Sequence, residues 1–149
     1  MSYDFCVREV GDPPPCKCCG RGPGSAYVDL GDPTYNVGDM FRLATGGWFK
    51  QGTPVPVAEA AVMWADAVAH MRDHAEDYKP LEPENGRGSY AGALRCAEKV
   101  AGVLLRIVRD GGIECPAWEP LVSGEYDTDE EKAARPKRFV SMDDLVFVA

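Results

Sequence analysis

Two cysteines near the N-terminus have the spacing of a zinc knuckle. Cys16 and Cys19 are separated by two residues and followed by Gly20, so a single turn can direct both thiolates at one tetrahedral metal ion. A structural zinc site needs two further ligands, and the sequence offers no second knuckle. The candidate ligands are Cys6, Cys18, Cys115, His70 and His74. We therefore predict either a zinc site at Cys16 and Cys19 or a reduced cysteine-rich loop, and expect no other cofactor.

A second pair of metal-ligand residue types lies on an expected helix. His70 and His74 are one helical turn apart, a spacing at which two imidazoles can bind one metal ion. The segment lacks the Glu beside the first His that a zinc-protease helix requires. Both positions lie at the edge of an apolar stripe, so the alternative is a pair of boundary histidines.

Polar residues cluster at the starts of two expected helices. Thr34 and Asn36 precede one helix, and Asn85, Arg87 and Tyr90 precede or begin another. Open backbone N–H groups at a helix N-terminus attract anions, and arginine adds positive charge. These five residues predict a pocket for a small phosphorylated or nucleotide-like ligand. The alternative is that they cap helices, build a tight turn and hydrogen-bond the two segments to each other.

Carboxylates gather between the two long helices. Glu82 and Glu84 could be paired for acid–base chemistry. Neither is tied by its spacing to a nucleophile or a base, and carboxylates beside prolines at a helix end are usually solvated. The sequence therefore predicts no catalytic residue and a non-enzymatic protein, with a metal-dependent enzyme as the remaining enzymatic alternative.

Strand-like alternation marks both ends of the chain. Tyr3, Phe5 and Val7 alternate with polar residues, which indicates a half-buried strand. The predicted strands are residues 2–10, 26–30, 138–140 and 145–148. We expect the last of these to pair with the first.

Apolar residues at spacings of three and four predict two long helices. Pro56 is expected to begin the first, which Pro80 and Pro83 end. Ser89 is expected to cap the second, which Gly111 and Gly112 end. The stripes are Val57, Ala61, Trp64, Val68, Met71, Ala75 and Tyr78, then Tyr90, Leu94, Ala97, Ala101, Leu104 and Val108. Asn36 is expected to cap a short helix over residues 37–44.

These elements predict an α+β fold, with a small mostly antiparallel sheet packed by two long helices and one short helix. We expect a single domain over residues 1–149, with residues 116–137 as a loop or partly flexible segment. Trp48 and Phe49, in a glycine-containing loop, are expected to fold back onto the core as a lid or as partner contacts. The alternative is that these two aromatic residues simply close the core.

Composition and charge narrow the class of protein. A content of 45% hydrophobic and 27% charged residues is typical of soluble globular proteins. No segment has the length of a membrane span or the pattern of a signal peptide, so we expect a cytoplasmic protein without membrane contact. The net charge of −8 argues against general nucleic-acid binding, which needs clustered Lys and Arg.

Two ordered motifs carry a family resemblance. The segments Thr34–Arg42 and Leu81–Leu94, with the opening Met1–Phe5, resemble a family of small phage and bacterial proteins of unassigned function. That family carries an N-x-T-x-N…M element and an N-P-x-N-G-W-G-x-Y-x-G-L element. This chain departs from it at Asp32, where the family has Asn, and at Arg87, where it has Trp. The resemblance implies a phage or mobile-element origin and therefore the host cytoplasm.

Taken together, these features predict a phage or mobile-element accessory protein that binds a host or phage protein. The first alternative is a binder of a nucleotide-like molecule that sequesters a host defence signal. The second is the metal-dependent enzyme.

Overall fold

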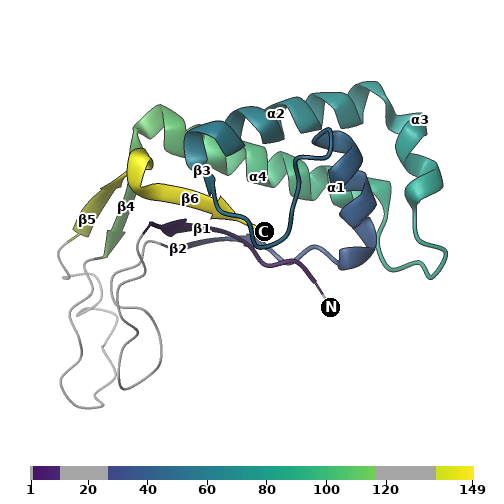
Figure 1. The fold of residues 1–149 in the computed structure, drawn as a ribbon, viewed down its shortest axis with the longest axis horizontal. Helices are drawn as coiled ribbons and strands as arrows, with labels where there is room; N and C mark the ends of the chain where they lie inside the picture. Colours follow the sequence, from purple (N-terminus) through teal and green to yellow (C-terminus); the bar gives the residue numbers. More distant parts are fainter. Residues whose placement is uncertain (1, 11–26, 117–136) are drawn as a thin grey trace, which may run out of the picture.

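A computed structural model describes residues 2–10, 27–116 and 137–149 of the chain. The predicted zinc ligands Cys16 and Cys19 lie outside these residues, as do most of residues 116–137. The described chain has an α+β fold in which helices cover one face of an antiparallel sheet (Figure 1). None of the helices in the described ranges is long and apolar enough to cross a membrane.

The sheet is built around the N-terminal strand. Strand β1 (Phe5–Glu9) pairs with β2 (Tyr27–Gly31) on one side and with β6 (Leu145–Val148) on the other, and β6 also pairs with the short β3 (Val55–Pro56). All of these pairings are antiparallel. The predicted pairing of the last strand with the first is therefore confirmed.

The helical layer contains two long helices. Helix α2 (Val57–Asp73) and helix α4 (Tyr90–Asp110) lie side by side above the sheet, and α1 (Gly38–Ala44) packs beside them (Figure 1). The Ser89 hydroxyl caps α4 by accepting a hydrogen bond from the Gly92 N–H, and Gly111 ends the helix with a φ of 75°. Both predicted ends of this helix are confirmed.

Two helix predictions were wrong. Asn36 does not cap α1, because it lies inside the short 3-10 helix η1 (Tyr35–Val37) and Val37 precedes α1. The first long helix ends at Asp73, and His74 has a non-helical φ of −124°. The chain resumes as α3 (Ala75–Tyr78) and the 3-10 helix η2 (Lys79–Leu81). The break turns Tyr78 into the core, where its side chain is fully buried.

A two-stranded ribbon follows α4 and was only half predicted. Strand β4 (Gly112–Pro116) pairs with β5 (Lys137–Ser141), and the 3-10 helix η3 (Met142–Asp144) leads from β5 into β6. The sequence indicated β5 but not β4, because Gly112, the second of the two glycines that end the helix, also begins this strand.

The core beneath the helices is aromatic. Phe5, Phe41 and Trp64 are fully buried, and their ring centroids lie 5.5 to 5.6 Å apart. Phe49 and Phe147 close the same cluster. Each ring buries a large apolar area, so this cluster joins the loop before β3 and strand β6 to the centre of the fold.

Candidate binding site

The two sequence motifs meet in the structure. The Asn36 side-chain amide donates a hydrogen bond to the Arg87 carbonyl oxygen at 3.0 Å. Gly88 lies against η1 so closely that a Cβ atom placed on it would be 2.8 Å from Val37 Cγ1 and 3.2 Å from Thr34 Cγ2. This bond agrees with the alternative in which the two motifs hydrogen-bond to each other. We call residues 82–90 and their contacts with residues 34–37 the latch.

The loop of the latch is held by its own polar groups. The Asn85 side-chain oxygen accepts a hydrogen bond from the Arg87 N–H at 2.9 Å, and the Gly86 N–H donates to the Pro83 carbonyl at 3.1 Å. Thr34 Oγ1 accepts from the Asn36 N–H at 3.4 Å. Asn85 and Arg87 are themselves exposed. Three of the predicted ligand residues, Thr34, Asn36 and Asn85, thus have structural hydrogen bonds.

The N-terminus of α4 already has an anionic partner. The Glu82 carboxylate accepts a hydrogen bond from the Tyr90 N–H at 2.8 Å, while Ser89 Oγ accepts from the Gly92 N–H at 3.1 Å. A carboxylate at this position interacts favourably with the helix dipole. A phosphate binding at the same N–H groups would have to displace Glu82 or approach its negative charge.

Tyr90 faces the helices rather than the latch loop. Its hydroxyl donates a hydrogen bond to the Met71 carbonyl oxygen at 2.6 Å, and its ring lies 5.6 Å from that of Tyr78. Tyr90 therefore joins α4 to the last turn of α2, which is a packing role.

The two histidines stack on each other at the end of α2. Their ring centroids are 4.3 Å apart, His70 Nδ1 shares a 2.5 Å hydrogen bond with the Tyr78 hydroxyl, and His74 Nδ1 lies 3.2 Å from the His70 carbonyl oxygen. Within residues 2–10, 27–116 and 137–149, no group of three or more His, Cys, Asp or Glu residues is arranged to hold a metal ion.

The raised pKa of Tyr78 leads us to predict how the free energy of unfolding changes at alkaline pH. Burial, with smaller contributions from Tyr90 and Asp77, raises the pKa of Tyr78 from 10.0 to about 12. The folded state therefore favours the neutral phenol, so this stabilisation is complete below about pH 10 and is lost as the pH rises towards about 12. We expect the free energy of unfolding of the natural protein to fall more steeply over this range than that of Tyr78→Phe, measured by urea denaturation. Parallel pH profiles would contradict this assignment.

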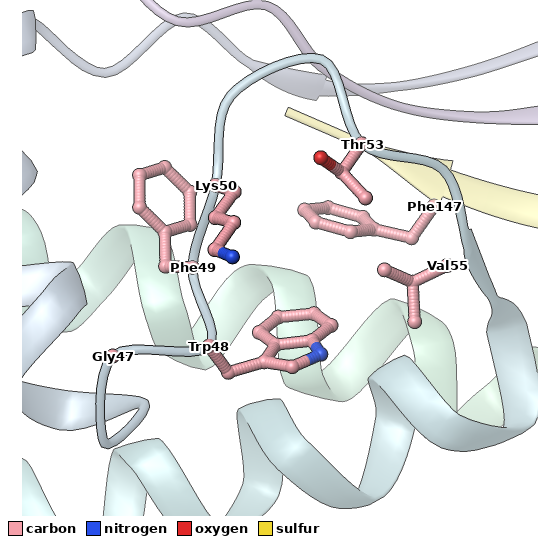
Figure 2. A pocket seen from close by; sticks show the side chains of 7 residues that line it. All are labelled: Gly47, Trp48, Phe49, Lys50, Thr53, Val55 and Phe147. Carbon is pink, nitrogen blue, oxygen red and sulfur yellow. The ribbon is translucent and has the colours of Figure 1, made fainter.

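A pocket opens between the loop before β3 and strand β6. It has a volume of about 250 Å³ and is lined by Gly47, Trp48, Phe49, Lys50, Thr53, Val55 and Phe147. Figure 2 shows the side chains of Trp48, Val55, Thr53 and Phe147 around the space, with the Lys50 ammonium group extending towards it. We call this the aromatic pocket.

The walls of the aromatic pocket are anchored to the core. The Phe49 side chain is 3% exposed and packs against Trp64 at 6.1 Å between ring centroids. The Phe49 N–H donates to Thr45 Oγ1 at 2.9 Å, and the Gly52 N–H donates to the Ala149 carbonyl at 2.7 Å. These contacts fix the loop at both ends, so the pocket exists before any ligand binds.

The pocket combines an apolar base with one cation. Trp48 is half-buried and stacks on Phe147 at 6.5 Å, whereas Lys50 and Thr53 are exposed at the rim. The sequence indicated Trp48 and Phe49 as lid or partner contacts, but Lys50, Thr53, Val55 and Phe147 were not predicted to join them. The signal available for two of these four is a Lys and a Thr that closely follow two consecutive aromatic residues.

Burial makes the two cysteines with described side chains poor nucleophiles. Loss of solvation, the largest cause, raises the pKa of Cys96 to about 11 and also raises the pKa of Cys6. Since the thiolate is the reactive and metal-binding form, these two residues are disfavoured for either chemistry at neutral pH.

Comparison of this chain with models of known protein families, with curated proteins and with solved structures gives no match. The family resemblance carried by the two motifs therefore stays a prediction, and the function must be argued from the site.

Proposed function

We propose that this protein is a non-enzymatic phage or mobile-element accessory protein that acts in the host cytoplasm by binding a host or phage protein. The observation that carries the proposal is the aromatic pocket, in which half-buried Trp48 stacks on Phe147 beside the exposed cation Lys50. Tryptophan in a well-packed depression is enriched among the residues that contribute most to protein–protein binding.

The pocket suits protein contact because it is formed in advance. Its base belongs to the same aromatic cluster as the core, since Phe147 packs against Phe5 at 5.6 Å and Trp64 at 5.8 Å. Binding of a partner therefore requires little further ordering of this loop, so the entropic cost of binding is small and the affinity is higher.

The nucleotide-like ligand at the latch is the weaker alternative. The Tyr90 N–H is occupied by the Glu82 carboxylate, and Asn36 and Asn85 bond to the backbone of Arg87. An anionic ligand would have to replace these bonds. A thermal-shift panel of nucleotides tests this alternative, because a ligand that binds only the native state must raise its stability.

Substitution of Trp48 tests the proposed function. We expect Trp48→Ala to capture at least about tenfold less partner protein from host lysate than the natural protein does. The reason is that a central tryptophan commonly contributes about 2 kcal/mol or more to the binding free energy. Capture is quantified by mass spectrometry on immobilised natural and variant proteins.

The matched control is Val62→Ala on α2, where Val62 is 59% exposed and lies outside the pocket lining. This variant should capture the same partner at the natural level. Equal capture by Trp48→Ala, or no specific partner for the natural protein, would refute the proposal for this pocket.

A further inference from the structure

We propose that the aromatic pocket receives an aromatic side chain of the partner protein, and that a carboxylate next to this side chain pairs with Lys50. The partner segment would thus present an aromatic side chain next to an acidic residue. This assignment rests on the proposed function and names the chemistry of the partner at the same site.

The size of the pocket favours one side chain over a larger ligand. Sites for drug-sized molecules usually enclose about 300–1,000 Å³, whereas this pocket has a volume of about 250 Å³. A single aromatic side chain fits that scale. It would occupy the space between the side chains of Trp48, Val55 and Phe147, which Figure 2 shows.

The aromatic lining favours a ring as the group that enters. Trp48 and Phe147 are already stacked, with an interplanar angle of 22°. A third ring can pack on them in an offset or edge-to-face arrangement, which adds to the energy of apolar burial. Val55 offers an aliphatic surface on the side of the space away from Lys50 (Figure 2).

The charge of Lys50 determines which group of the partner lies beside the ring. Lys50 is the charged residue among those lining the pocket, and in the described ranges no ion pair joins it to a carboxylate. The chain as a whole has a net charge of −8, so its general field opposes the approach of an anion. The local ammonium group, which points towards the space in Figure 2, is therefore what selects a carboxylate.

The smallest probe of this chemistry is a phenyl ring with a carboxylate on a short chain. We would titrate the purified full-length protein with phenylpropionate and follow the indole N–H resonance of Trp48 by NMR. Neutral phenylpropanamide and cationic phenylpropylamine carry the same ring and serve as matched probes. The titration extends to about 20 mM, because a molecule of this size binds weakly.

We expect phenylpropionate to shift the Trp48 resonance and to bind about three- to fivefold more tightly than the amide, with the amine weakest. Lys50→Gln should remove the preference of the carboxylate over the amide. Lys99→Gln, which removes an exposed lysine of α4 outside the pocket lining, should retain that preference. A preserved NMR spectrum shows that each variant is folded.

Three results would overturn the assignment: equal binding of all three probes, a preference for the amine, or no shift of the Trp48 resonance at the highest concentration. These results differ from failure of the proposed function. If partner capture depends on Trp48 but the three probes show no charge preference, only the assigned chemistry is refuted. If partner capture does not depend on Trp48, the proposed function at this pocket is refuted.

Discussion

Phe147→Ala should lower the free energy of unfolding by about 3–5 kcal/mol, the usual cost of truncating a large core ring. Phe147 is 2% exposed and packs against Phe5 and Trp64 while also forming the base of the aromatic pocket. Its removal leaves a cavity at the edge of the aromatic cluster, beneath the pocket. Because domains of this size are stable by only about 5–15 kcal/mol, the variant should be close to unfolding.

Urea denaturation measures this effect, and Phe147→Leu is the control. Leucine keeps most of the apolar contact, so its cost should be about 1–2 kcal/mol, less than half of that for alanine. A cost below about 1 kcal/mol for Phe147→Ala would mean that the ring is not part of the core.

Gly88→Ala should destabilise the protein by about 3 kcal/mol, because two unfavourable terms act at one position. The backbone of Gly88 has a φ of 116°, which residues with a side chain rarely adopt. In addition, the new Cβ would be 2.8 Å from Val37 Cγ1, so either the buried Val37 side chain or the latch loop would have to shift. The expected result is a lower urea midpoint together with weaker protection of the Asn36 side-chain amide from hydrogen exchange.

Two other glycines provide matched controls for this substitution. Gly86 has a φ of 68°, and a Cβ atom placed on it would meet no other part of the described chain within 4 Å, so Gly86→Ala should cost only about 1 kcal/mol of backbone strain. Gly102 lies in the exposed middle of α4 with equally open space, and Gly102→Ala should stabilise by about 0.5–1 kcal/mol. Similar costs at Gly86 and Gly88 would contradict the close contact with η1.

Local chemistry explains why the helices were predictable. Helix α4 begins after Ser89, whose side chain accepts a capping hydrogen bond, and ends at Gly111, whose backbone is left-handed. Both features depend only on nearby residues. The alternation of Phe5 and Val7 likewise identified β1 because both side chains enter the core. Such signals survive in the sequence because tertiary contacts agree with them.

Long-range contacts explain what was missed. His74 is in a segment with helical periodicity, yet the chain breaks there so that Tyr78 can reach the core and bond to His70. Asn36 is a residue type that favours caps, but its side chain bonds to Arg87, fifty-one positions away. In both cases the tertiary partner outweighs the local preference.

The aromatic pocket was missed for the same reason. Trp48 and Lys50 are close in sequence, but the base of the pocket is Phe147 of β6, and β3 brings Val55 beside it through the pairing of Val55 with Phe147. No local pattern encodes that pairing. The polar residues of the latch had a clear pattern, which indicated a ligand, although their hydrogen bonds in the structure are to the protein itself.

The most direct test of partner binding at the aromatic pocket is site-specific photocrosslinking in host cells. A benzophenone side chain would replace Thr53 at the rim of the pocket or, as the control, Val62 on the exposed face of α2. We predict a discrete adduct with one partner protein from position 53 and none from position 62. An adduct from position 62 alone, or none from position 53, would contradict binding at this pocket.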